Sequence, residues 1–172
     1  MDIANLFLPL LVIILAISLV IVYQRRKKRS HIPQLRRIAQ LSEAKQLNIR
    51  NKDVINGQFI GLDPIKKILL LLHLEEPTEP IKIIPLADIS FCRIVQESRD
   101  IVHRGRNRTT NEKEIVSIRL ILYSFRKRHE AEFLFFDSGL NESRDMPRLL
   151  QKAEFWNNKI IATGRISNFY HE

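Results

Sequence analysis

The chain of 172 residues has few of the residues that build specialised scaffolds. It contains one cysteine, Cys92, so an internal disulfide and a cysteine-rich zinc module are both excluded. Five glycines and seven prolines exclude collagen-like and low-complexity chains. Hydrophobic residues, in contrast, make up 45% of the sequence, which is enough for one core in one small domain.

Sequence motifs for nucleotide binding, metal binding and catalysis are also missing. The chain has neither a G-x-x-x-x-G-K-S/T loop nor a G-x-G-x-x-G turn, the two glycine-rich devices that hold phosphates. Its histidines form no H-x-x-x-H or H-E-x-x-H pair. Cys92 has no histidine near it in sequence, so we predict a small buried hydrophobe rather than a nucleophile. The sequence therefore predicts no enzyme activity, no catalytic residue, no cofactor and no metal.

The positive charge of the chain, formally +9, is concentrated in one segment. Residues 25–52 contain ten Lys or Arg and one acidic residue, whereas residues 53–172 contain 18 basic and 17 acidic residues. A nucleic-acid-binding domain carries its basic excess on its own folded surface. Because residues 53–172 are nearly neutral, no nucleic-acid partner is expected.

The N-terminal segment is apolar. Residues 3–24 carry no charge, and 22 helical residues at a rise of about 1.5 Å each would cross a hydrocarbon layer of about 30 Å. A basic cluster follows, made of Arg25, Arg26, Lys27, Lys28 and Arg29. Such a cluster favours the cytoplasmic side, so we expect a single-pass membrane protein with its N-terminus outside and its domain in the cytoplasm. A cleaved signal peptide is disfavoured because its charges would precede the apolar run. The cluster also predicts contact with anionic lipid headgroups.

The remaining sequence predicts an α+β fold. Helix-forming residues over 34–47 predict a short linker helix, and strand-like runs separated by turns then predict one antiparallel sheet of five to seven strands. Residues 97–113 are predicted to be a polar loop. The hydrophobic period then changes to that of a helix, so residues 145–163 are expected to form an amphipathic helix that caps the sheet, with Trp156 in the core. The predicted segments are a transmembrane anchor (1–24), a basic juxtamembrane segment with the linker helix (25–52), the cytoplasmic domain (53–164) and a tail (165–172).

A family resemblance rests on this order of elements, on the segment Ile84-Pro-Leu-Ala-Asp-Ile89 and on the closing helix with Trp156. Together they resemble the bacterial pleckstrin-homology-like (PH-like) domains, in which a strongly bent sheet, a split barrel, is capped by a C-terminal helix. The resemblance covers about residues 53–163, and only five strands are clear where that fold usually has seven. It implies a binding module, since members of the family bind lipids, peptides or proteins.

Two basic clusters on predicted turns are the candidate contact sites. The first comprises His103, Arg104, Arg106 and Arg108, and the second Arg126, Lys127 and Arg128. Either could contact anionic headgroups or an acidic partner, or could be a solvated loop balanced by neighbouring glutamates. We therefore predict a membrane-anchored cytoplasmic binding or scaffold module for a protein partner or an anionic membrane surface. The alternatives are a structural subunit of a membrane complex, and a ligand sensor or enzyme whose site is assembled from residues distant in sequence. The oligomeric state is not predicted.

Overall fold

The computed structural model describes residues 33–76, 78, 80–104, 109–125 and 129–166. Contacts divide the chain into two compact units, Met1–Leu41 and Ser42–Glu172. The described residues of the first unit belong to a helix over residues 33–44, in the region where the linker helix is predicted. Pro33 begins this helix, in the first turn, where a backbone N–H has no partner within the helix and proline is tolerated.

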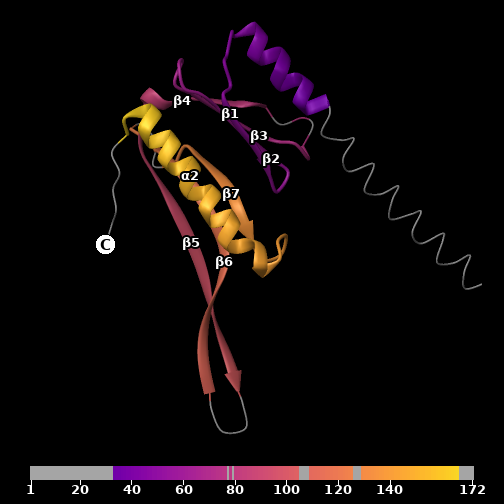
Figure 1. The fold of residues 1–172 in the computed structure, drawn as a ribbon, viewed down its shortest axis with the longest axis vertical. Coiled ribbons are helices and arrows are strands. Elements are labelled where there is room, and N and C mark those ends of the chain that lie inside the picture. The colour runs from indigo at the N-terminus through magenta and orange to yellow at the C-terminus, as the bar shows by residue number, and fades with distance from the viewer. Residues whose placement is uncertain (1–32, 77, 79, 105–108, 126–128, 167–172) are drawn as a thin grey trace, which may run out of the picture. The chain divides into compact units, whose positions relative to one another are not determined.

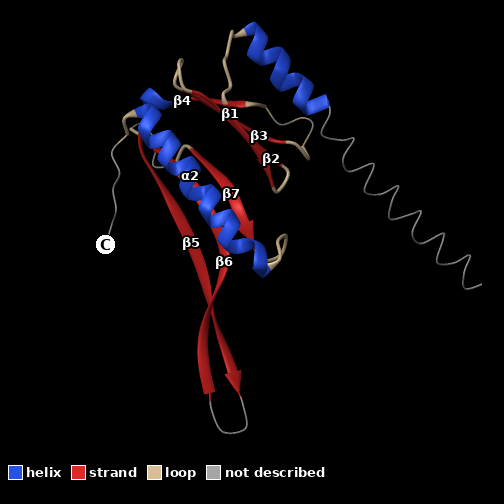
Figure 2. Cartoon of the chain, in the orientation of Figure 1, coloured by secondary structure: helices blue, strands red, loops and turns tan. Residues whose placement is uncertain are grey.

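The second unit begins with an antiparallel sheet of four strands (Figures 1 and 2). In order across the sheet these are β1 (Asn51–Ile55), β2 (Gln58–Asp63), β3 (Ile68–His73) and β4 (Lys82–Pro85). Asn56 and Gly57 connect β1 to β2 with φ angles of 49° and 71°. A two-residue hairpin turn of this kind needs positive φ at both positions, which asparagine and glycine tolerate best.

A second antiparallel sheet follows a short 3-10 helix, η1 (Leu86–Asp88). Its strands, in order, are β5 (Ile89–Arg104), β6 (Thr109–Ser124) and β7 (Ala131–Asp137). The last pair between β6 and β7 is Ser117 with Asp137. Residues 98–104 of β5 and 109–116 of β6 therefore continue as a two-stranded ribbon, which we call the arm (Figure 1).

The arm corrects the prediction of a polar loop over residues 97–113. A strand is recognised in sequence by alternation, and alternation arises when one of its two faces is buried. The arm lies beyond the sheet, and its strands pair only with each other. Polar residues consequently occupy successive positions, as in the cross-strand pair of Arg99 and Glu114, whose charged groups lie 3.4 Å apart.

The chain closes with a 3-10 turn, η2 (Ser143–Asp145), and a long helix, α2 (Met146–Gly164). The amphipathic helix predicted over residues 145–163 is thus present. Asp145 occupies the N-cap position but makes no capping hydrogen bond. Its carboxylate instead accepts one from Arg148 at 3.2 Å. After Gly164 the chain turns through Arg165, which adopts the left-handed conformation that often ends a helix.

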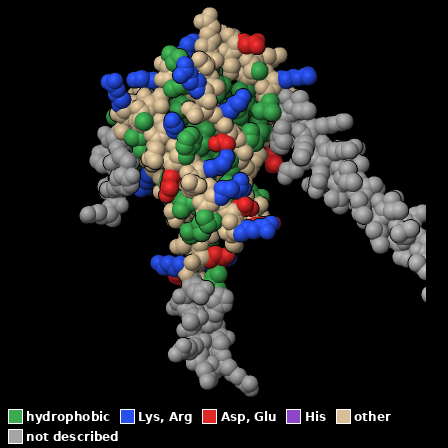
Figure 3. All heavy atoms as spheres, in the orientation of Figure 1, with side chains coloured by type: hydrophobic (Ala, Val, Ile, Leu, Met, Phe, Trp, Pro, Cys, Tyr) green, Lys and Arg blue, Asp and Glu red, His purple; other side chains and the backbone are tan. Residues whose placement is uncertain are grey.

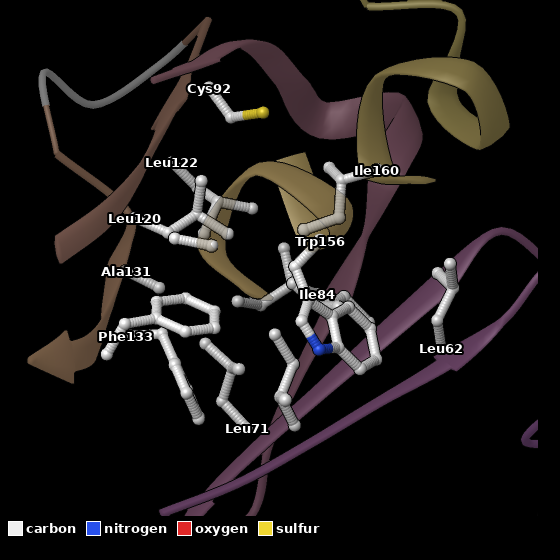
Figure 4. Packing of buried hydrophobic residues seen from close by; sticks show 14 of the residues in the cluster. Leu62, Leu71, Ile84, Cys92, Leu120, Leu122, Ala131, Phe133, Trp156 and Ile160 are labelled. Carbon is white, nitrogen blue, oxygen red and sulfur yellow. The ribbon is translucent and has the colours of Figure 1, made fainter. Parts of the chain in front are cut away.

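The core of the second unit combines residues of both sheets with the apolar face of α2 (Figure 4). Trp156 lies in this core with no exposed surface, as its place in the helical pattern predicts. Its indole Nε1 donates to Asp53 Oδ2 on β1 at 2.9 Å, and Lys152 Nζ donates to Asp53 Oδ1 at 2.7 Å. We call these three residues the β1–α2 clamp.

Cys92 is buried in the same core, as predicted. Its Sγ donates to Asn157 Oδ1 on α2 at 3.0 Å. Burial raises the pKa of the Cys92 thiol to about 12, because the thiolate would have to form away from water. The thiol therefore stays protonated at neutral pH.

Two predictions about the whole chain need correction. The strands form two sheets of four and three strands rather than one sheet, and the change of sheet falls at Pro85 and η1. The predicted transmembrane anchor (1–24) lies outside the described residues, and no described helix is long and apolar enough to span a membrane. The helix over 33–44 is short, and α2 carries charged residues along its length. The structure therefore does not support a single-pass membrane protein with an outside N-terminus and a cytoplasmic domain.

Candidate protein interface

The three-stranded sheet has one face directed away from the core. Its inner face carries cross-strand pairs such as Cys92 with Leu122, both of which are buried in the core. Because side chains alternate along a strand, the intervening residues lie on the opposite side, which we call the outer face. It comprises Phe91, Arg93, Val95 and Glu97 on β5, Ser117, Arg119, Ile121 and Tyr123 on β6, and Glu132 and Leu134 on β7.

Aromatic and arginine side chains occupy one part of the outer face. The rings of Phe91 and Tyr123 are stacked, with centroids 4.3 Å apart. Arg93 extends over Tyr123, where its guanidinium carbon lies 5.3 Å from the ring centroid and its NH2 donates to the tyrosine Oη at 3.0 Å. These contacts hold an exposed arginine and a half-buried tyrosine in defined positions before any partner arrives. Tyrosine and arginine are among the residues that contribute most binding energy at protein interfaces.

Charged side chains occupy the next part of the outer face. Glu97 forms an ion pair with Arg119 and accepts a hydrogen bond from Ser117 Oγ at 3.0 Å. Glu132 lies farther from its cations, with Oε2 at 3.9 Å from Arg119 NH1 and 3.7 Å from His129 Nε2. The Nε of Arg119 is buried and has no hydrogen-bond partner among the described residues. Figure 3 shows the molecule from the side of α2, and acidic and basic side chains are interspersed on that face as well.

Side-chain amides connect the two sheets where β7 has no neighbouring strand. Gln58 Oε1 accepts from the backbone N–H of Leu134 at 3.0 Å, which directs its Nε2 toward His73 Nε2 at 2.5 Å. Asn56 Nδ2 donates to the carbonyl of Phe135 at 3.1 Å. We call this set of contacts the seam.

The seam closes one side of a cavity of about 350 Å³, which we call the seam cavity. It is lined by Gln58, His73, Glu97, Val116, Ser117, Arg119, Glu132, Leu134 and Asp137. Most of these residues belong to the outer face, so the cavity opens beside the charged part of it. A second cavity, of about 450 Å³, lies where β6 ends, between β4 and Phe125. The ring of Phe125 is 75% exposed there.

Most of the residues predicted as contact sites cannot be placed. The basic cluster Arg25–Arg29, the residues Arg106 and Arg108, and the cluster Arg126–Arg128 lie outside the described residues. His103 and Arg104 form the end of β5, so they belong to the arm rather than to a loop. Their proposed contacts with headgroups or with an acidic partner stay predictions.

The outer face was not predicted as a site, although the sequence contains part of its signal. Alternation in β6 places Ile118, Leu120 and Leu122 in the core and thereby leaves the residues between them outside. The charged and aromatic side chains at those positions could have been noted from this pattern alone. No described group of three or more His, Cys, Asp or Glu residues is placed to hold a metal ion.

Comparisons of the chain with protein-family models, with curated proteins and with solved structures found no match.

Proposed function

We propose that the chain is a protein-binding module that contacts its partner through the outer face and the adjacent arm. The observation that carries this proposal is the cluster of Phe91, Tyr123 and Arg93 at the surface. Within the described part of the chain, α2 and the buried core lie on the opposite side of this sheet, and among the outer-face residues only Phe91, near the start of β5, also packs partly against that core. A partner would therefore meet a rigid, partly apolar surface whose key side chains are already in place, so little ordering entropy would be lost on binding.

The arm supports the same proposal. A two-stranded ribbon is at best marginally stable by itself, because it buries little apolar surface. The arm extends beyond the last pair of β6 with β7 and contributes little to the core cluster. Its length is therefore better explained by contact with another molecule than by the stability of this chain.

The PH-like resemblance forms part of this proposal. The fold has seven described strands, in sheets of four and three, followed by a closing helix. Seven is the number of strands that the PH-like fold usually has, which supports the proposed resemblance. Binding modules with such a fold include protein-binding members. The outer face carries both acidic and basic side chains, which favours a protein partner over a strongly anionic membrane surface.

Paired charge reversals test the proposal. The tagged full-length chain is purified from its own cells as the wild type, as Arg93→Glu, and as Arg144→Glu. Arg93 is on the outer face, whereas Arg144 precedes α2 and is 80% exposed beside Glu142. Proteins recovered in stoichiometric amount with the wild type are then purified, and their dissociation constants with all three chains are measured.

The proposal predicts that Arg93→Glu weakens binding at least tenfold, because an arginine held over an aromatic ring is a typical interface hot spot. The control Arg144→Glu should change the dissociation constant less than twofold, since it alters only one exposed ion pair. Equal binding by the wild type and the Arg93→Glu chain would contradict the proposal, as would equal losses in the two variants.

A further inference from the structure

We infer that the seam cavity receives a cationic side chain, the guanidinium of arginine or the ammonium of lysine, from a peptide segment of the partner. This inference rests on the proposed function, because it assigns a particular role to one end of the same interface. It is carried by the charge of the cavity, by its apolar walls and by one unpaired donor at its wall.

The charge of the lining selects a cation. Three carboxylates line the cavity, from Glu97, Glu132 and Asp137, whereas Arg119 contributes the only guanidinium in the lining. The three carboxylates and the one guanidinium give these charged side chains a formal charge of −2, and an anionic guest would be repelled.

Glu132 is the carboxylate best placed to receive the guest. Its Oε2 lies 3.9 Å from Arg119 and 3.7 Å from His129, distances beyond those of good hydrogen bonds. Its side chain is 47% exposed, so a cation can reach it from solvent. A guest guanidinium could make shorter, charge-assisted contacts with this carboxylate without displacing a protein hydrogen bond.

The size and the remaining lining of the cavity fit a side chain of this kind. A volume of about 350 Å³ is at the lower end of the range for small-ligand sites. Val116 and Leu134 supply apolar wall, which suits the methylene stem of arginine or lysine. The hydrogen bond from the Leu134 N–H to Gln58 fixes the wall that β7 provides.

One donor at the cavity wall points to a peptide rather than to a bare cation. The buried Nε of Arg119 has no acceptor among the described residues, and a buried polar atom of this kind is normally paired. A backbone carbonyl beside the guest side chain would supply the missing acceptor. An amine without a carbonyl would leave this donor unpaired.

Titration of the full-length chain with small probes tests the inference, with amide chemical shifts as the readout. The probes are N-acetyl-arginine amide, its neutral isostere N-acetyl-citrulline amide, and n-butylguanidine, which has one guanidinium and no carbonyl. We expect the arginine probe to shift the amides of Ser117 and Leu134 in a saturable manner. The citrulline probe should bind at least fivefold more weakly, because it lacks the positive charge.

Two carboxylate substitutions complete the test. Glu132→Gln keeps the shape of the side chain and should weaken the arginine probe at least fivefold, whereas Glu142→Gln, at an exposed carboxylate outside the cavity, should leave it unchanged. Equal binding of the arginine and citrulline probes, or no effect of Glu132→Gln, would overturn the inference. If n-butylguanidine bound as tightly as the arginine probe, the assignment to a peptide would be overturned and a cationic ligand without a backbone carbonyl would be indicated.

The two proposals fail separately. If Arg93→Glu abolishes partner binding while no cationic probe enters the cavity, the interface stands and the cationic guest is refuted. If the probes bind but Arg93→Glu leaves partner binding intact, the reverse holds.

Discussion

Removal of the Asp53 carboxylate from the β1–α2 clamp is expected to destabilise the fold by about 2–3 kcal/mol. Trp156 has no exposed surface, so Asp53→Ala leaves a buried indole N–H without an acceptor, which costs about 1–3 kcal/mol. The ion pair with Lys152 contributes at most about 1 kcal/mol more, because that side chain is 36% exposed and solvent screens the pair.

Two further variants separate these contributions. Asp53→Asn keeps an oxygen for the indole but loses the charge and turns an NH2 donor toward Lys152. That ammonium is exposed enough to move into solvent, so the cost should not exceed about 1 kcal/mol. Lys152→Met removes the ammonium and leaves the indole hydrogen bond in place, with a cost in the same range. Urea unfolding measures all three, and Trp156, the only tryptophan of the chain, reports directly on the clamp by its fluorescence.

The expected order of destabilisation is Asp53→Ala first, with the other two variants close together and well below it. If Asp53→Ala and Lys152→Met lowered the free energy of unfolding equally, the indole hydrogen bond would contribute nothing. The reasoning from buried unpaired donors would then be refuted for this site.

Three other predictions follow from buried or strained groups. Burial raises the pKa of Asp63, but hydrogen bonds from the backbone N–H groups of Lys66, Asn48 and Ile65 outweigh it and hold the pKa below 3.8. The stability that the Asp63 charge confers is therefore complete above that value and is lost as pH falls through the lowered pKa. Urea unfolding at several pH values should show the difference in free energy of unfolding between wild type and Asp63→Asn closing below about pH 4. A difference that widened in acid would contradict this prediction. Cys92 is buried and its pKa is about 12, so its thiol should react with a thiol reagent at pH 8 only as the chain unfolds. Complete labelling of the native protein within seconds would show that the Cys92 thiol is accessible to solvent and contradict the prediction. Gly57→Ala should lower the free energy of unfolding by about 1–2 kcal/mol in thermal or urea unfolding. Residue 57 has a φ of 71°, and a Cβ there would lie 3.0 Å from the Glu75 side chain. Unchanged stability would contradict the turn geometry.

The sequence predicts those elements in which one face is buried. The helical period around Trp156 gives α2 almost to the residue, and the alternation before Ser124 gives the body of β6, because burial imposes a period that can be read. The continuous apolar run over residues 68–72 also suits a buried strand, and it forms most of β3.

The arm, the turn between β1 and β2, and the seam are not predicted from the sequence, each for a different physical reason. The arm shows no alternation because it extends beyond the sheet that packs on the core, and only Ile115 at its base packs against the core cluster. The turn at Asn56 and Gly57 carries the strongest short signal for a hairpin, and reading that signal would have separated β1 from β2. The seam could not be predicted, because Gln58 and Leu134 are 76 positions apart and meet only when both sheets have formed.

Photo-crosslinking in cells tests most directly whether the outer face is the binding surface. A benzoylphenylalanine is introduced in place of Val95 or Ile121 on the outer face, and in place of Phe155, which is 44% exposed on α2. The proposed function predicts an adduct with one and the same protein from both outer-face positions and no such adduct from position 155. Adducts formed from position 155 alone, or equally from all three positions, would contradict it.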